Sequence, residues 1–332
     1  MLAAWAAFAG RAETETEARR TKLLAEFRRP ASTDGLYPSE NPFTPAKSAL
    51  GKLLFFEPIL SASGSRSCAS CHNPGLSWGD GLPRGVGDSG QPMSRRSPTL
   101  LDVAWLPLVG WDGKFPDIEA VTFAAITGPA NMGLDEGSAM RRLAATPGYK
   151  EAFATAFGDE RITRGRIERA VATYVRTLVS APSSFDRWVD GDALAISQAA
   201  QRGFGLFTGR AGCAACHSGW SFTDGSFHDI GTAQGDDLGR GKLFPSSTKL
   251  RYAFKVPTLR DVARRAPYMH DGSVPDLAGV VELYDRGGIE RPSRSPLIRP
   301  LGLTADEKTD LVAFLRTLTG TPEPVEAPVL PR

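Results

Sequence analysis

The spacing of apolar residues along the chain predicts several amphipathic helices. The clearest run, Arg164 to Leu178, has its apolar residues at i, i+4, i+8 and i+11, which brings them onto one face of a helix. A second signal is Thr304 followed by Glu307, a pair that caps helix N-termini. The pattern predicts helices at residues 138–145, 149–157, 164–178, 196–207 and 304–318.

The segments between these helices are rich in glycine, proline and serine, which predicts loops. The predicted loops cover residues 61–90, 110–134 and 208–276, with a linker at residues 180–184 or near Gly191. The proline-rich tail beyond Gly320 is expected to be loosely held. The chain therefore divides into two halves, each with helices flanking long loops.

Composition and charge exclude several classes of protein. The 332 residues are 41% hydrophobic, and 39 basic residues nearly balance 37 acidic ones, so no large basic surface for nucleic acid is expected. No run approaches the ~18 consecutive apolar residues of a membrane-spanning helix. With 35 glycines and 25 prolines, the chain has too many loop formers for a coiled coil or a continuous helical bundle.

All four cysteines fall in two copies of one motif. The copies are Cys68-Ala69-Ser70-Cys71-His72 and Cys213-Ala214-Ala215-Cys216-His217. C-x-x-C-H is the attachment signature of haem c, because two thiols three residues apart reach the two vinyl groups on one haem edge and the adjacent histidine binds the iron. A zinc ribbon would have its cysteine pairs ~15–20 residues apart, and a thioredoxin-like site would have one pair after a strand.

The sequence therefore predicts two covalently bound haem c groups. The expected fold is mostly α, with two cytochrome-c-like haem domains built by duplication, at residues 14–190 and 191–332. Haem c is attached outside the cytoplasm, so a periplasmic protein is expected. Residues 1–13 are interpreted as a signal-peptide remnant, because residues 1–9 are apolar and small residues precede the polar stretch from Arg11, although a basic first region is missing. The alternative is a wrongly assigned start.

Further motifs, spread over residues 45–320, occur in a fixed order around the two haem motifs. They are Leu53-Leu54-Phe55-Phe56, Arg95-Arg96-Ser97-Pro98-Thr99-Leu100, Trp111-Asp112-Gly113-Lys114, Phe227-His228-Asp229-Ile230-Gly231, Phe254-Lys255-Val256-Pro257-Thr258-Leu259-Arg260 and Pro267-Tyr268-Met269-His270-Asp271-Gly272. This set resembles the bacterial di-haem cytochrome c peroxidase and MauG family. The resemblance implies two haem domains that meet across an interface, with Arg95 and His228 as cofactor contacts.

The resemblance also implies the ligand of the second haem. Tyr284 lies where ordinary di-haem peroxidases have a methionine and the MauG-like branch has a tyrosine. A phenolate ligand stabilises ferric and higher states of iron and lowers the reduction potential. If Tyr284 is a core residue instead, Met269 or His228 is the rival ligand.

The first haem departs from the ordinary peroxidases as well. Those carry a distal histidine in the loop after the first motif, and residues 73–99 contain none. The iron bound by His72 is therefore expected to be five-coordinate and open to peroxide. Trp111 matches the tryptophan that lies between the two haems in the family, which implies that it relays oxidising equivalents.

One departure affects the chemistry of peroxide cleavage. Asn131 stands at the position of the family's distal catalytic glutamate. Asparagine can hydrogen-bond peroxide but cannot accept its proton. Asp135 or Glu136 could act instead through a water molecule.

Another departure concerns the calcium ion that the family binds between its domains. Arg96 stands at the asparagine ligand, and the carbonyl ligands fall on Arg265 and Pro267. A guanidinium group has no acceptor for Ca²⁺ and repels it, so calcium is not expected.

Three functions remain open at this point. The resemblance implies an oxidoreductase that uses hydrogen peroxide to form a high-valent di-haem state and oxidises a tryptophan or tyrosine of a partner protein by long-range electron transfer, as in MauG and its relative from methanobactin operons. The second is an ordinary di-haem peroxidase that takes electrons from a small redox protein. The third is a non-enzymatic di-haem electron-transfer protein, favoured if Asn131 abolishes peroxide cleavage. No nucleic-acid partner and no membrane insertion are expected.

Overall fold

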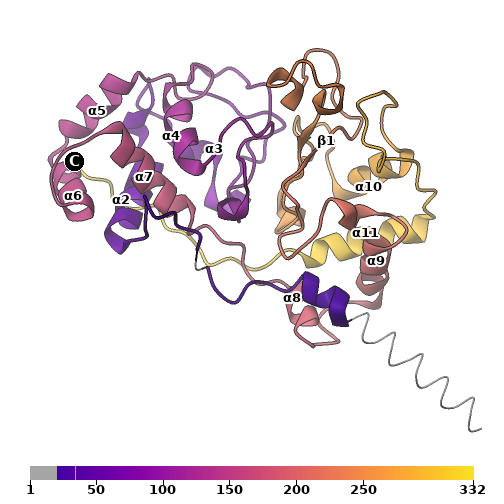
Figure 1. Ribbon diagram of the computed structural model, residues 1–332. Helices are drawn as coiled ribbons and strands as arrows, with labels where there is room; N and C mark the ends of the chain where they lie inside the picture. Colours follow the sequence, from indigo (N-terminus) through magenta and orange to yellow (C-terminus); the bar gives the residue numbers. More distant parts are fainter. Residues whose placement is uncertain (1–20, 34) are drawn as a thin grey trace, which may run out of the picture.

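The computed structural model describes residues 21–33 and 35–332, which form a mostly α-helical molecule of two lobes (Figure 1). Residues 21–26 are helical, and the helices that follow are α2 (Pro45–Phe56), α3 (Cys68–Cys71), α4 (Ile118–Thr127), α5 (Glu136–Ala144), α6 (Pro147–Phe157), α7 (Arg164–Val175), α8 (Ser184–Val189), α9 (Gln198–Thr208), α10 (Leu277–Arg286) and α11 (Ala305–Thr317). Short 3₁₀ turns are η1 (Pro58–Leu60), η2 (Pro74–Leu76), η3 (Val103–Trp105), η4 (Cys213–Ala215), η5 (Arg240–Lys242), η6 (Thr248–Leu250) and η7 (Val262–Arg264). Strand β1 (Phe227–His228) pairs antiparallel with β2 (Phe254–Lys255). The interpreted signal remnant lies outside the described residues.

The five helices predicted from apolar spacing form, to within a few residues, as α5, α6, α7, α9 and α11. The capping pair also forms, because Thr304 accepts from the backbone N–H of Glu307 and the Glu307 carboxylate accepts from the N–H of Thr304 at 2.9 Å. Among the described helices, none combines the length and the apolar character needed to cross a membrane.

The prediction of a loop at residues 110–134 is wrong at its centre, where α4 forms. Its sequence, Ile118 to Thr127, is apolar on almost every side, so it carries no amphipathic repeat. The helix begins after Asp117, whose carboxylate accepts from the N–H of Ala120 at 2.8 Å, and it packs against α7. Tertiary packing, which local spacing does not record, therefore stabilises this helix.

Each lobe has its own hydrophobic core, crossed by one pair of helices. In the first lobe α2 packs on α7, and in the second α9 packs on α11. Both crossings need a glycine: a Cβ atom on Gly51 would lie 2.0 Å from the carbonyl oxygen of Ala170, and one on Gly203 would lie 2.0 Å from that of Asp310. The same device in both lobes supports an origin by duplication.

The loops between the helices repeat as well, at one constant spacing. Residues 98–128 correspond position by position to residues 257–287. The shared features are Pro-Thr-Leu at the start, a left-handed aspartate (Asp102 and Asp261, both φ 59°), an isolated bridge (Val109 with Phe115, Tyr268 with Val274), an aspartate N-cap (Asp117 and Asp276) and a ten-residue helix. Helix α10 is therefore the counterpart of α4.

The two ends of the chain cross between the lobes (Figure 1). Phe27, near the start, is buried in the second core beside Phe204 and Phe222. The tail beyond Gly320, expected to be loose, runs back to the first lobe, where Pro331 packs against Gly148 at the start of α6. Helix α8 also packs into the second core, although the predicted division at residues 190/191 placed it in the first domain.

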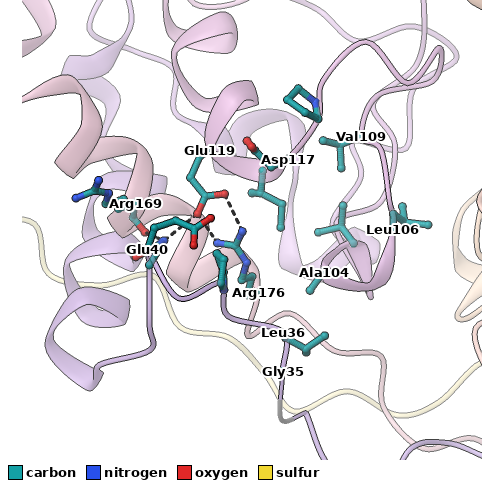
Figure 2. A pocket seen from close by; sticks show the side chains of 15 residues that line it. Gly35, Leu36, Glu40, Ala104, Leu106, Val109, Asp117, Glu119, Arg169 and Arg176 are labelled. Carbon is teal, nitrogen blue, oxygen red and sulfur yellow. Dashed lines mark hydrogen bonds and ion pairs between the residues drawn. The ribbon is translucent and has the colours of Figure 1, made fainter.

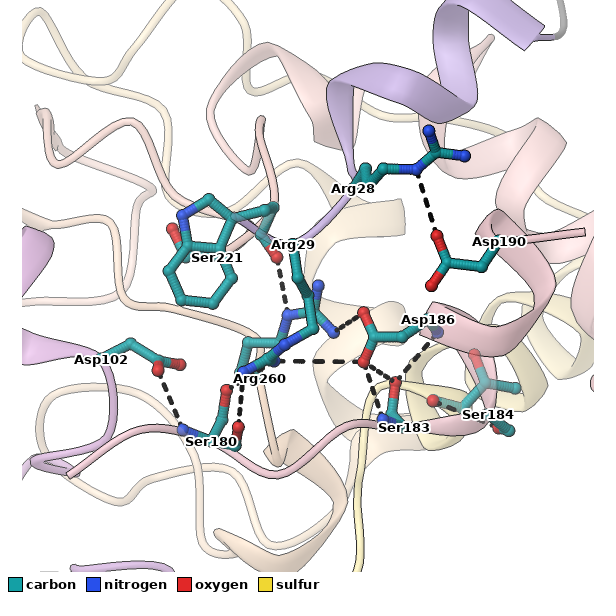
Figure 3. A network of polar contacts seen from close by, with 12 residues as sticks. Arg28, Arg29, Asp102, Ser180, Ser183, Ser184, Asp186, Asp190, Ser221 and Arg260 are labelled. Atoms are coloured by element: carbon teal, nitrogen blue, oxygen red, sulfur yellow. Dashed lines mark hydrogen bonds and ion pairs between the residues drawn. The ribbon is translucent and has the colours of Figure 1, made fainter. Parts of the chain in front are cut away.

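A buried polar network joins the lobes (Figure 3). The fully buried Arg260 of the second lobe donates to Asp186 of α8 at 2.7 Å. Asp102 of the first lobe accepts from the N–H of Ser180 at 2.9 Å, and Arg29 donates to the carbonyl of the same serine at 2.6 Å. The network thus ties the linker to the N-terminal segment and to both domains.

Candidate functional site

The first haem motif forms a one-turn helix with its histidine at the C-terminal end. Cys68 and Cys71 begin and end α3, and the N–H of His72 donates to the carbonyl of Cys68 at 2.9 Å. His72 Nδ1 lies 3.1 Å from the carbonyl oxygen of Trp78. A carbonyl only accepts, so Nδ1 carries the proton and Nε2 is left to bind a metal.

The second motif repeats this arrangement. His217 Nδ1 lies 2.9 Å from the carbonyl oxygen of Phe222. Trp78 and Phe222, which supply the two accepting carbonyls, both adopt left-handed backbone conformations, with φ 60° and 54°. Burial lowers the pKa of His72 and of His217, which favours the neutral imidazole that iron binds.

A largely apolar cavity lies beside the second motif. It is lined by Cys213, Cys216 and His217, and Tyr284 of α10 also lines it. Burial, followed by the neighbouring thiols, raises the pKa of Tyr284. A cavity with two thiols, one oriented imidazole and a phenol fits a haem c with histidine and tyrosine ligands.

The two rival ligands line the same cavity. Met269 and His228 both contribute to its wall. His228 Nε2 is engaged at 2.8 Å by the hydroxyl of Ser226, and Tyr284 lines the same cavity as Cys213 and Cys216. Tyr284 as the iron ligand stays a prediction.

The internal repeat identifies a residue that the sequence reasoning missed. Tyr284 is the eighth residue of α10, and the eighth residue of the corresponding helix α4 is Ala125. A methyl group therefore occupies in the first domain the position that a potential ligand occupies in the second. The constant spacing of the Pro-Thr-Leu and Asp-Gly motifs was the available signal.

Trp111 lies at the junction of the two domains. It belongs to the first lobe but lines the second cavity, and its indole Nε1–H donates to the carbonyl of Arg96 at 2.9 Å. Its ring meets that of His270 edge-on, with centroids 6.5 Å apart, and His270 stacks on Phe254 at 3.7 Å. The repeat makes Trp111 and His270 counterparts, one from each domain.

Charged groups hold this junction in place. Arg95 donates to Asp112 of its own domain at 2.9 Å and to Asp237 of the other at 3.2 Å. Asp237 also lies 2.9 Å from Nε2 of His270. Arg95, predicted as a cofactor contact, is therefore committed to carboxylates on both sides of the interface, with only its Nε buried without a partner.

The other predicted catalytic residues lie in the first domain. The carbonyl of Asn131 accepts from the N–H of Asp88 at 2.6 Å, which fixes it to the loop after the first motif. Asp135 caps α5, and Glu136 pairs with Arg164 at 3.0 Å, with both side chains about half exposed. Asn131 therefore lies at the loop that follows the first motif, whereas Glu136 forms an ion pair with Arg164 at the surface.

The residues at the expected calcium position do not fit a cation. Arg96 Nη2 donates to the carbonyl of Arg265 at 2.9 Å, so a positively charged donor is directed at an oxygen that would serve as a ligand. Within residues 21–33 and 35–332, no cluster of three or more His, Cys, Asp or Glu side chains could hold a metal ion.

A separate pocket opens on the first lobe (Figure 2). Its charged wall is an ion pair in which both Nη atoms of Arg176 donate to the Glu119 carboxylate, at 2.6 and 2.7 Å. Asn41 adds a hydrogen bond to the same carboxylate at 2.9 Å. This ion pair joins Glu119 of α4 to Arg176 at the C-terminal end of α7, so the two charges satisfy one another.

Comparison with known proteins agrees with this geometry. Residues 45–194 match the family model for di-haem cytochrome c peroxidase, and residues 200–319 match that for cytochrome c. The chain is 51% identical to methylamine utilization protein MauG of Methylorubrum extorquens, over 93% of this chain and 88% of the relative. It is 36% identical to cytochrome-c peroxidase IdrP1 of Denitromonas iodatirespirans, over 89% and 87%.

Among solved structures, the chain is similar to a MauG-like protein associated with microbial copper homeostasis. The TM-score is 0.80 at 30% sequence identity, covering 85% of this chain and 91% of the other. The two motifs, their matching surroundings and similarity over nearly the whole length lead to one conclusion: the chain belongs to the di-haem cytochrome c peroxidase and MauG family, and it is an oxidoreductase with two covalently bound haem c groups.

Proposed function

We propose that this enzyme uses hydrogen peroxide to oxidise a tryptophan or tyrosine side chain of a partner protein by long-range electron transfer, in the periplasm. The observation that carries the proposal is the asymmetry of the repeat: Tyr284 lines the second cavity, and its counterpart in the first domain is Ala125. The first domain is thus suited to a haem iron with an open coordination position, and the second to a haem iron bound by two protein ligands. The similarity to MauG supports the same assignment.

The bound haems supply the redox chemistry, in which one peroxide takes up two electrons and two protons to give two waters. The chain's own residues prepare the first site. The Nδ1–H of His72 donates a hydrogen bond to the Trp78 carbonyl, which fixes the orientation of the ring and leaves Nε2 free to bind iron. The amide of Asn131 can donate a hydrogen bond to peroxide. No step is assigned to Glu136, because Arg164 engages its carboxylate at the surface.

In this proposal Trp111, at the junction of the two domains, passes electrons between them. Its Nε1–H donates to a backbone carbonyl, which is not a base and cannot take the proton. The indole therefore keeps its proton when it gives up an electron, and the transfer needs no proton acceptor. Electron transfer through protein also removes the need for a substrate cavity beside the first haem.

The test is stopped-flow mixing of the fully oxidised protein with one equivalent of hydrogen peroxide. The proposal predicts an immediate change in the haem spectrum that persists until an electron donor is added. A spectrum that changes only after one-electron reduction would identify an ordinary peroxidase, the alternative that the similarity to IdrP1 supports. No reaction in either state would identify an electron-transfer protein.

A further inference from the structure

Two arginines from different domains meet beside the second cavity. Arg96 Nη2 donates to the backbone carbonyl of Arg265 at 2.9 Å, and Arg265 Nη2 donates to the carbonyl of Thr258 at 2.5 Å. Both arginines line the cavity that contains Cys213 and His217. Two positive charges therefore lie together in the wall of a haem site.

Neither charge has an anionic partner. Among the described residues no carboxylate oxygen lies within 4 Å of either guanidinium group, and the Nε atom of each is buried without a hydrogen-bond partner. The fully buried Arg260, by contrast, pairs with Asp186 at 2.7 Å. Burial, together with the nearby charge of Arg96, lowers the pKa of Arg265 to about 10, so Arg265 is still protonated at neutral pH.

Buried unpaired charges of one sign are costly, and an anion between them removes that cost. Guanidinium groups bind carboxylates with strong, charge-assisted hydrogen bonds. A haem carries two carboxylates on the edge away from its vinyl groups, and Cys213 and Cys216 bind the vinyl edge. A haem bound here brings the missing negative charge into the same cavity.

We propose that Arg96 and Arg265 form a carboxylate-binding site that spans the domain interface and holds a carboxylate of the haem attached to Cys213 and Cys216. The site joins that haem to both domains at once. It rests on the presence of this haem and not on the identity of the enzyme's substrate. The alternative source of the same chemistry is a free inorganic anion.

The first test measures the reduction potentials of both haems in the holoprotein carrying Arg265→Gln. Loss of a positive charge at a haem carboxylate stabilises the ferric state, so the potential of the His217 haem is expected to fall while that of the His72 haem stays unchanged. Arg264→Gln, which removes the same charge from the exposed neighbour, is the matched control. Equal shifts in the two variants, or no shift in either, would overturn the proposal.

A second measurement separates the two sources of the anion. If a haem carboxylate fills the site, the potential and the melting temperature of the parent protein stay constant as chloride or phosphate is raised at constant ionic strength. A dependence on phosphate that Arg265→Gln abolishes would mean that a free anion binds there, and the haem assignment would fail.

Arg96→Lys keeps the positive charge and provides a separate test if the Arg265→Gln variant does not fold. Lysine cannot reproduce the planar fork of donors, so the carboxylate bending band of the second haem in resonance Raman spectra is expected to shift while its potential stays near that of the parent. An unchanged band would show that Arg96 does not bind the carboxylate.

Discussion

At the scale of single residues, the two haem ligands are oriented by backbone carbonyls and not by acidic side chains. The carbonyls of Trp78 and Phe222 accept from His72 and His217. A carbonyl is a weaker acceptor than a carboxylate and leaves the imidazole neutral. The two histidines therefore have similar support, so the proposed difference between the haems would come from the residues on the opposite face of each haem.

Tyr284→Phe tests that difference at the second haem. Phenylalanine keeps the ring but removes the oxygen that is proposed to bind the iron, so the reduction potential of the second haem is expected to rise and its low-spin signal to change. Electron paramagnetic resonance and potentiometric titration measure the two effects. Spectra and potentials equal to those of the parent would show that Tyr284 only packs.

Trp111→Phe tests the path between the domains. The indole is replaced by a ring that is much harder to oxidise, so oxidation of the partner protein is expected to slow by at least about tenfold, a barrier increase of ~1.4 kcal/mol. Haem content should be unchanged, because Trp111 supplies no covalent bond. Trp105→Phe, at a tryptophan of the first lobe that contacts Trp220 of the second, is the control, and equal slowing in both variants would argue against a specific relay.

Removal of calcium is expected to have no effect. Arg96 donates to the carbonyl of Arg265 at the place where the family's ion would bind, so chelation should leave spectra and peroxide reactivity unchanged. Loss of reactivity on chelation, restored by added Ca²⁺, would contradict this.

Residue types were the part of the site that the sequence could predict well. C-x-x-C-H is a local pattern, so Cys68, Cys71, His72 and their second-domain counterparts could be assigned without a fold. Partnerships between distant residues could not: nothing local indicates that Arg95 bridges Asp112 and Asp237, or that Arg164 engages Glu136. A charged side chain has many possible partners in the sequence, and only the folded structure shows which of them it meets.

At the scale of elements, amphipathic helices were predictable and uniformly apolar ones were not. The large apolar residues of α7 recur at helical spacing along one face, whereas α4 is apolar almost throughout. Helix α10, the counterpart of α4 in the internal repeat, was not among the five predicted helices either. The two halves share their motifs at a constant spacing, and this relation between α4 and α10 is clear once both helices are seen in the structure.

The same comparison predicts how to change the first haem. Ala125→Tyr would place on α4 the side chain that α10 carries at its eighth position. The His72 haem is then expected to become six-coordinate and low-spin, and to lose its direct reaction with peroxide. Absorption and magnetic resonance spectra give the spin state. Thr127→Tyr, on the exposed side of α4, is the control and should leave the haem high-spin.

At the scale of the whole molecule, a few buried charges hold the two domains together. Asp186→Asn leaves the guanidinium of Arg260 buried without its anion, which is expected to destabilise the protein by about 3–5 kcal/mol. Chemical denaturation followed by haem absorbance measures the change. Asp190→Asn, which removes a more exposed ion pair with Arg28 at the C-terminal end of the same helix, should change the midpoint little.

Each end of the chain packs against the lobe that lies farther from it in the sequence. Phe27 is among the first described residues to be synthesised, yet its ring packs on Phe222, whose carbonyl orients His217. The first domain in turn waits for Pro331, almost the last residue, to cover α6. Each end of the chain therefore completes the packing of the opposite lobe, so removal of Phe27 is expected to loosen the packing around Phe222, and removal of Pro331 is expected to loosen the packing at the start of α6.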